Sequence, residues 1–144
     1  MTIEEIMELW ESDSKIDRLE LEKEVLKIAS LHNKYYRIFV EERMRLRGLE
    51  AKMKQLKLDK YEFLTQGPNE ESLAKGWSLP AKGMILKAEI PMYLEADRDI
   101  IELSLKIGMQ QEKIEFLESI IKSFVNRGFN IKTAIDIRKF ENGG

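Results

Sequence analysis

Apolar residues recur at steps of three and four through two long stretches of the chain, and this spacing restricts the fold more than any other feature. Residues 16–65 contain no proline and a single glycine, Gly48. Of thirteen positions counted from Leu21 in alternating steps of four and three, ten are apolar. The positions are Leu21, Val25, Ile28, His32, Tyr35, Phe39, Glu42, Leu46, Leu49, Met53, Leu56, Lys60 and Phe63. The pattern predicts one helix of about 45 residues, or two nearly continuous helices, with one apolar face.

A second stretch, residues 92–127, repeats the pattern. Nine of ten positions counted in this way are apolar, and Gln110 is the exception. The positions are Tyr93, Ala96, Ile100, Leu103, Ile107, Gln110, Ile114, Leu117, Ile121 and Phe124. We expect Gly128 to end this second helix, and Asn130 to cap a last short helix over residues 131–140.

The start of the chain and the segment between the two stretches have different sequence features. Thr2 and Glu5 have the spacing of a capping box, which predicts a short amphipathic helix at the start of the chain. Residues 67–92 are punctuated by glycine and proline, as is typical of an irregular connector. These residues are Gly67, Pro68, Gly76, Pro80, Gly83 and Pro91. Within the connector, the apolar run over residues 84–90 is expected to form a short extended segment.

Two long helices with wide apolar faces cannot cover each other fully as an isolated hairpin. Burying a further face is worth about 1.5–3 kcal/mol for each large apolar side chain, which favours self-association. We therefore expect an all-α homo-oligomer of helical bundles, with a monomeric bundle of three or four helices as the alternative. The expected regions are an N-terminal helical region with the nucleic-acid-binding helix (1–66), the connector (67–92) and a C-terminal helical oligomerisation region (93–144).

Several classes of chemistry find no support in the sequence. The chain has no cysteine and one histidine, His32, which its heptad position predicts to be a packed core residue. It has no phosphate-binding GxxxxGK[ST] loop, no nucleophile paired with a base, no secretion signal and no apolar run of about 20 residues. Asp97 and Asp99 are better explained by a negative first helical turn than by a cation site. We expect a cytoplasmic protein that is not an enzyme, with no catalytic residue, cofactor, metal or membrane partner.

The near-neutral net charge of −2 hides a strong separation of charge along the chain. Residues 1–24 carry nine acidic and three basic side chains, whereas residues 25–60 carry ten basic and four acidic ones. The basic block lies within the first helical pattern. It therefore predicts a stiff cationic surface that suits a polyanion such as nucleic acid.

The residues expected to contact this polyanion lie on the first long helix. Arg43, Arg47, Lys54, Lys57 and Tyr61 are spaced to fall along one side of it, and Lys52 and Lys60 widen the positive surface. The cations fit a phosphate backbone, and Tyr61 fits a stacked base. No base-reading motif is present, so we expect sequence-tolerant, salt-dependent binding. An ordinary solvated helix face is the alternative interpretation.

Three segments resemble the UvsY family, the recombination mediators of tailed phages related to T4. They are IIKSFVNRGFNIKTAIDIRKFENG, IPMYLEADRDIIELSLKI and LKLDKYEF. The resemblance implies a ring-shaped homo-oligomer, a hexamer or heptamer, that binds single-stranded DNA in DNA recombination and repair. It also implies that the protein helps a RecA-like phage recombinase to replace the phage single-strand-binding protein, in the cytoplasm of the infected bacterial host.

The resemblance also implies a location for the DNA contacts. The basic patch of the family maps to residues 52–60, where Lys57 matches a basic position. Gln55 stands where the family can be basic, and Lys54 can supply that charge from the neighbouring position. A coiled-coil structural protein or a prefoldin-like chaperone without DNA binding is the competing hypothesis, because such proteins also join two long helices through an irregular connector.

Overall fold

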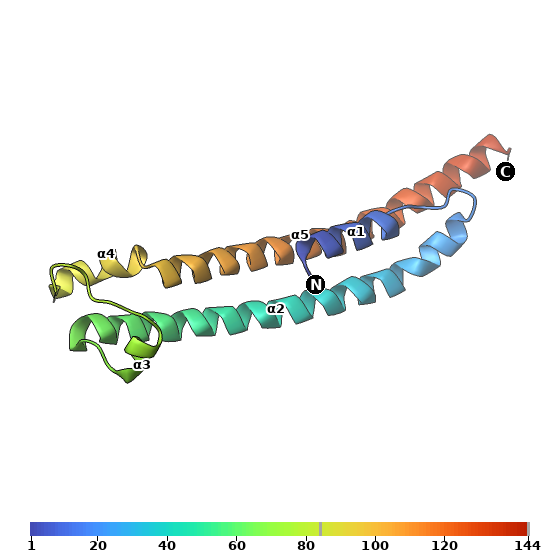
Figure 1. The fold of residues 1–144 in the computed structure, drawn as a ribbon. Helices are drawn as coiled ribbons and strands as arrows, with labels where there is room; N and C mark the ends of the chain where they lie inside the picture. Colours follow the sequence, from blue (N-terminus) through green and yellow to red (C-terminus); the bar gives the residue numbers. More distant parts are fainter. Residues whose placement is uncertain (84, 144) are drawn as a thin grey trace. The chain divides into compact units, whose positions relative to one another are not determined.

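The protein is almost entirely helical. The computed structural model describes residues 1–83 and 85–143, and over these residues it contains five α-helices, one 3-10 helix and no strand (Figure 1). In chain order the elements are α1 (Ile3–Asp13), α2 (Leu21–Gln66), α3 (Glu70–Ala74), the 3-10 helix η1 (Lys87–Glu89), α4 (Ile90–Glu95) and α5 (Arg98–Glu141). The all-α fold class is confirmed, and so is the first long helix, which is 46 residues long.

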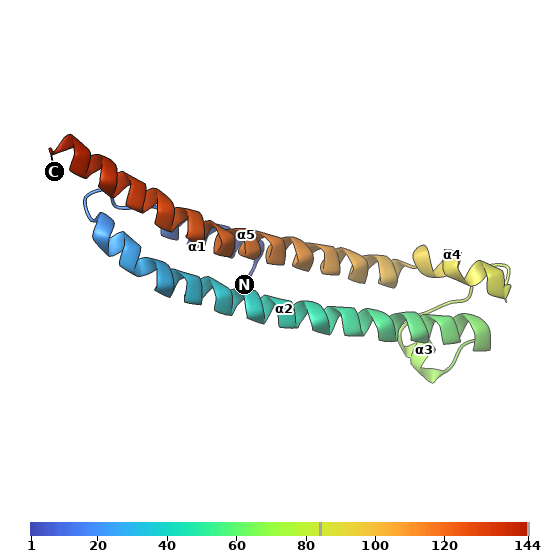
Figure 2. The same ribbon diagram turned by 180° about the vertical axis from the view of Figure 1, so that it is seen from behind.

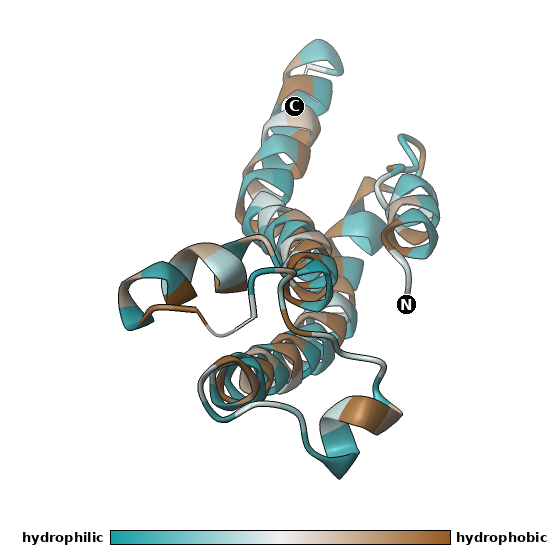
Figure 3. Cartoon of the chain, turned by 60° about the vertical axis from the view of Figure 1, so that its left-hand side comes forward, coloured by the Kyte–Doolittle hydropathy of each residue, from teal (hydrophilic) through white to brown (hydrophobic). Residues whose placement is uncertain are grey.

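The chain divides into two compact units, and each contains part of α2 and part of α5. Unit 1 comprises Met1–Met44 with the described part of Gln111–Gly144, and unit 2 comprises Arg45–Gln110. Hydrophilic and hydrophobic residues alternate along both long helices (Figure 3). This is the distribution expected when one side of a helix packs and the other side faces water.

The first helix begins where the sequence predicts. The Thr2 hydroxyl accepts a hydrogen bond from the Glu5 amide at 3.1 Å, and the Glu5 carboxylate accepts one from the Thr2 amide at 3.2 Å. This capping box satisfies two backbone amides that the first turn would leave unpaired. The helix lies in front of α5 in Figure 1 and is largely hidden behind it in Figure 2.

The core of unit 1 forms where α1, α2 and α5 meet. Its buried members are Ile6, Tyr35, Leu117, Ile120 and Phe124. Trp10 packs edge-on against Tyr35 and Phe124, with ring centroids 5.4 and 5.6 Å away. The Tyr35 hydroxyl donates a hydrogen bond of 2.8 Å to the Asp13 carboxylate. Burial and this hydrogen bond raise the pKa of Tyr35 far above its ordinary value, so the hydroxyl remains a donor.

Two buried ion-pair groups tie α2 to α5 in unit 1. The Arg127 guanidinium lies 3.1 Å from the Glu24 carboxylate and also donates to the Asp13 carbonyl oxygen at 2.8 Å. Glu42 accepts hydrogen bonds from Lys113 at 3.4 Å and from the N-terminal ammonium at 3.3 Å. Because these pairs join opposite ends of the two segments, α2 and α5 run antiparallel here. Buried charges of this kind require such partners.

Unit 2 has a smaller core around the end of α2. Its buried members are Phe63, Leu64 and Ile90. Helix α2 ends at Gln66, and Gly67 follows with a φ of +89°, a left-handed conformation that favours glycine at this position. The connector then forms α3, which begins with a capping box between Asn69 and Ser72. The connector is therefore more ordered than its composition predicts.

The expectation of an extended segment over residues 84–90 is wrong for the residues that the structure describes. Met84 lies outside them. Lys87–Glu89 form η1, and Ile90 begins α4. Pro91 favours this helix start, because the first turn of a helix does not need the proline's missing amide hydrogen.

The second long helix begins later than predicted. A break separates α4 from α5, which begins at Arg98 rather than near residue 92. The cause is Asp97, whose carboxylate accepts a hydrogen bond of 3.0 Å from the Ile100 amide. A side chain that binds a first-turn amide in this way starts a new helix and opposes continuation of the previous one.

The same helix also ends later than predicted. It continues through Gly128 to Glu141, so the end at Gly128 and the separate helix capped by Asn130 are both wrong. Ile131, one turn after Gly128, is only 2% exposed. Burying this side chain outweighs the roughly 1 kcal/mol by which glycine disfavours a helix interior.

Most heptad positions of the first stretch are buried or half-buried, with two exceptions. Val25 and His32 are exposed, so the expectation of a packed core histidine is wrong. The His32 ring instead stacks on the Tyr36 ring at the surface of α2. The polar positions Glu42 and Lys60 are buried and ion-paired.

Candidate nucleic-acid interface

Four basic side chains share one side of α2. Arg43, Arg47, Lys54 and Lys57 follow at steps of four, seven and three residues, which keeps them within about 80° of one another around the helix axis. All four are exposed, and none forms an ion pair with a carboxylate in residues 1–83 and 85–143. We call these four residues the cationic face. Because no carboxylate of the described residues neutralises these charges, the face attracts anions.

The ends of the cationic face carry aromatic side chains. In unit 1 the Arg43 guanidinium lies 5.3 Å from the centroid of the Phe39 ring, which holds the cation in place. In unit 2 Tyr61 follows Lys57 by one turn and is 38% exposed. Tyr61 and the four cations thus have the exposure and common side that binding to DNA requires. Their role in binding DNA stays a prediction.

Lys52 is exposed but does not belong to this face. It precedes Lys54 by two residues, so its side chain leaves α2 at about 160° from that of Lys54 around the axis. A strand that runs along the cationic face would leave Lys52 on the other side of the helix. Lys52 therefore adds to the positive potential of α2 rather than to the row of cations that touch the strand.

Lys60 lies in the interior of unit 2 rather than on a binding surface. It is 6% exposed, and its ammonium lies 2.8 Å from the Asp99 carboxylate and 3.1 Å from that of Asp97. The ammonium also lies 3.9 Å from the centroid of the Trp77 ring. Two carboxylates and an indole face occupy the surroundings of this cation, so we remove Lys60 from the candidate interface.

The acidic partners of Lys60 have a structural role. The hydrogen bond from Lys60 lowers the pKa of Asp99 below its usual range, and so keeps the carboxylate charged. Asp97 both binds Lys60 and caps α5. Among the residues that the structure describes, no group of three His, Asp or Glu side chains is arranged to hold a metal ion.

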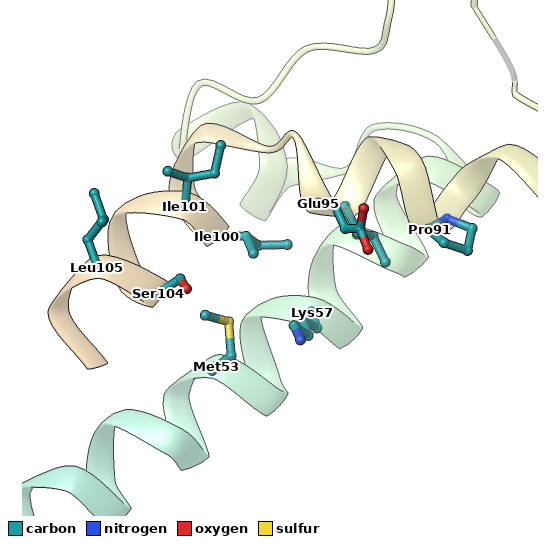
Figure 4. Close-up of a pocket in the computed structure, with 9 residues that line it drawn as sticks. Met53, Lys57, Pro91, Glu95, Ile100, Ile101, Ser104 and Leu105 are labelled. Atoms are coloured by element: carbon teal, nitrogen blue, oxygen red, sulfur yellow. The ribbon is translucent and has the colours of Figure 1, made fainter. Parts of the chain in front are cut away.

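A cavity of about 470 Å³ lies beside Lys57 in unit 2 (Figure 4). Met53 and Lys57 line it from α2, and α4 and α5 complete it. The residues from these two helices are Pro91, Leu94, Glu95, Ile100, Ile101, Ser104 and Leu105. Its lining is largely apolar, with Lys57 and Glu95 as its charged members, so it offers no row of cations for phosphates.

One feature of the sequence could have predicted that Lys60 is buried. Lys60 occupies a heptad position of α2, which already predicted burial, whereas Lys54 and Lys57 do not. The partners that neutralise Lys60 come from the start of α5 and from the connector, far away in the sequence. Only the fold brings them together.

Exposed cations along one side of a helix are the kind of surface that can hold a nucleic-acid backbone without reading its bases. A family model described as "Recombination, repair and ssDNA binding protein UvsY" matches residues 9–144. The chain belongs to the UvsY family, which confirms the resemblance found in its sequence.

Crystal structures of the bacteriophage T4 recombination mediator protein UvsY are similar to this chain. The lattice type I structure has a TM-score of 0.81 at 20% identity and covers 95% of this chain and 98% of its own. Lattice types II and IV give TM-scores of 0.80 and 0.79 at 22% and 21% identity, with 98% or more of each chain covered. At such identities the likeness establishes the fold. A search among curated proteins found no match.

No helix in the described part of the chain is both long enough and apolar enough to span a lipid bilayer.

Proposed function

We propose that this protein binds single-stranded DNA along the cationic face of α2 and acts as a recombination mediator. In this role it helps a RecA-like recombinase to replace a single-strand-binding protein in the cytoplasm of an infected bacterium. Membership of a family described by recombination, repair and single-stranded DNA binding supports the proposal. The observation that carries it is the cationic face itself, four exposed cations without a carboxylate partner in the described residues.

The chemistry of this face favours the DNA backbone. Phosphates that replace the small anions around the arginines and lysines release counterions from the strand, and this gives affinity without sequence preference. Over residues 43–57 the chain carries six basic side chains and one acidic side chain, Glu50. A strand held by its phosphates keeps its base edges free. Free base edges are what a recombinase needs for pairing, so we assign mediation to this mode of binding.

We further propose that the protein works as a homo-oligomer, a hexamer or heptamer, in which residues 93–144 contribute to assembly. Large apolar side chains remain exposed along α5, and a second copy would remove them from water. They are Ile101, Leu105, Met109, Val125, Phe129, Ile137 and Phe140. Each added copy repeats the cationic face, so modest interactions combine through avidity into tight binding of a long strand.

The alternative of a prefoldin-like chaperone or a purely structural coiled coil has less support. Its sequence basis was two long helices joined by an irregular connector with a possible extended segment, and within that segment Lys87–Glu89 form η1 and Ile90 begins α4 instead. That alternative also gives no reason for four exposed cations on one side of α2 that lack a carboxylate partner in the described part of the chain.

The proposal is tested by substituting both Lys54 and Lys57 by alanine and titrating a fluorescent oligonucleotide at several salt concentrations. We expect weaker binding and a shallower dependence of log K on log salt, by about 0.7 for each phosphate that the variant no longer neutralises. A double variant of two other exposed lysines, Lys106→Ala with Lys132→Ala, is the charge-matched control. An unchanged slope in the first variant, or an equal decrease in the control, would count against this site.

Mediation needs its own measurement. Loading of a RecA-like recombinase onto a strand already covered by single-strand-binding protein is followed with and without this protein. We expect loading to accelerate with the wild type and to accelerate less with the Lys54/Lys57 variant. Normal DNA binding without any acceleration would retain the binding site and remove the mediator role.

A further inference from the structure

Three ring side chains precede the cationic face on the same side of α2. His32, Tyr36 and Phe39 follow at steps of four and three residues, and Arg43 comes four residues later. At 3.6 residues per turn these side chains leave the helix within about 60° of one another. We call His32, Tyr36 and Phe39 the aromatic row.

The members of the aromatic row contact one another along the helix. His32 and Tyr36 stack, with ring centroids 5.8 Å apart and planes inclined by 11°. The Tyr36 and Phe39 centroids are 6.0 Å apart, and the Arg43 guanidinium lies over Phe39. The protein therefore holds a series of flat groups in order before any ligand arrives. Such preorganisation lowers the entropy that binding must overcome.

The row is anchored in unit 1 and open to solvent. Phe39 is half-buried against the core, and His32 touches the edge of Phe124 on α5 at a centroid distance of 6.2 Å. Tyr36 is nevertheless 46% exposed to solvent, and His32 is exposed as well. Two stacked rings thus present free surface beside the residues through which α2 packs into the core.

We propose that the aromatic row is a stacking platform for the bases of the strand whose phosphates the cationic face binds. This inference rests on the proposed function. Every nucleobase has a flat π face, so stacking on histidine, tyrosine and phenylalanine adds affinity without sequence preference. Charge decides between this ligand and a second copy of the chain. Arg43 ends the row with a cation that has no carboxylate partner among residues 1–83 and 85–143, and this suits a phosphate next to a stacked base.

The test compares two probes with equal numbers of phosphates, a thymidine oligonucleotide and an abasic oligonucleotide of the same length. The wild type should bind the thymidine strand more tightly, by about fivefold or more for each stacked base. Substituting both His32 and Tyr36 by alanine should strongly reduce this preference, since only Phe39 and Tyr61 keep their rings, and should leave the salt slope unchanged. Tyr36→Phe, which keeps a ring, should retain the preference.

Two further variants separate this inference from the proposed function. Lys54→Ala with Lys57→Ala should lower the salt slope and keep the preference for bases, whereas Leu73→Ala, which removes an exposed apolar side chain from α3, should change neither. If the wild type binds both probes equally, the stacking platform is refuted while the phosphate site stands. If it binds neither probe, the proposed function itself fails.

One more outcome would overturn the platform. The mass of each variant is measured by light scattering without DNA. A change of mass for the His32/Tyr36 variant would identify the row as an interface between copies of the chain. An unchanged mass, together with a reduced preference of that variant for the thymidine strand, would support stacking.

Discussion

Lys57 and Lys60 are three residues apart in α2, but the ammonium of Lys57 faces solvent and that of Lys60 is buried in an ion pair. Lys57 is exposed and has no carboxylate partner in the described residues. Lys60 is buried and lies within 3.1 Å of two carboxylates. The same contrast separates the cationic face as a whole from the charges buried on the packed side of α2.

This contrast shows that basic residues close together in the sequence need not belong to one charged surface of the folded protein. On the packed side, a cation is stabilised by specific carboxylates, and removing one partner leaves an unpaired charge in a poorly hydrated place. On the exposed side, a cation is hydrated and contributes little to folding. Substitutions on the two sides of α2 should therefore separate into effects on stability and effects on DNA.

The largest effect is expected in unit 1 on replacing Arg127 by leucine. Arg127 and Glu24 are both less than 10% exposed, and loss of the guanidinium also leaves the Asp13 carbonyl without its donor. We expect a loss of about 3–5 kcal/mol in the free energy of unfolding, measured by urea denaturation at a fixed protein concentration. Lys132→Ala, an exposed cation on the same helix, is the control and should change stability by less than about 0.5 kcal/mol.

A smaller effect is expected in unit 2 on replacing Lys60 by methionine. Both carboxylate partners are partly exposed, so water can stabilise them after the ammonium is removed. We expect a loss of about 2–3 kcal/mol, below the range for a fully buried pair. The matched comparison is Lys57→Met, which should leave stability nearly unchanged and weaken DNA binding. A stable Lys60 variant with a lower salt slope would reverse our assignment of the two lysines.

The sequence predicted the regular parts of the fold because they depend on local spacing. The apolar steps from Leu21 set the length of α2, and Thr2 with Glu5 set the start of α1. The misplaced boundaries depend on tertiary packing. Gly128 stays helical because burial of the next turn outweighs the preference of glycine for a helix end.

The candidate site shows the same limit. Arg47, Lys54 and Lys57 do not occupy heptad positions, so their side chains leave α2 away from its apolar side. Their exposure was therefore predictable from the sequence. The environment of Lys60 was not, because Asp99 and Trp77 approach it only in the folded chain. His32 occupies a heptad position and is exposed, since the apolar face of a straight helix drifts relative to a strict seven-residue repeat.

A smaller effect is expected from acid, which should remove the stability that the ion pair between Lys60 and Asp99 contributes. The pKa of Asp99 is lowered in the folded protein by its hydrogen bond from Lys60. A carboxyl whose folded pKa is lowered contributes stability above the unfolded pKa and loses it as pH falls through the folded pKa. The contribution should be complete above about pH 5 and decrease progressively below about pH 4, as the pH falls from the unfolded pKa toward the lowered folded pKa. At this degree of exposure it should not exceed about 1 kcal/mol.

The measurement is the free energy of unfolding of wild type and Asp99→Asn between pH 3 and pH 7. We expect the wild type to be more stable at neutral pH and the difference to shrink as the solution becomes acidic. A difference that is constant with pH would mean that the charge of Asp99 does not contribute through Lys60.

The smallest effect concerns the backbone beside the Arg127 ion pair. A Cβ added to Gly128 would meet Ile28 Cδ1 at 3.7 Å, an ordinary van der Waals distance, and the backbone there is helical. Gly128→Ala should therefore stabilise the protein by about 0.5 kcal/mol, because alanine restricts the unfolded chain and fits the folded one. Gly67→Ala, at a φ of +89°, should destabilise it instead. If both variants are less stable than the wild type in urea denaturation, α5 does not continue through residue 128, and the geometry that buries Arg127 would need revision.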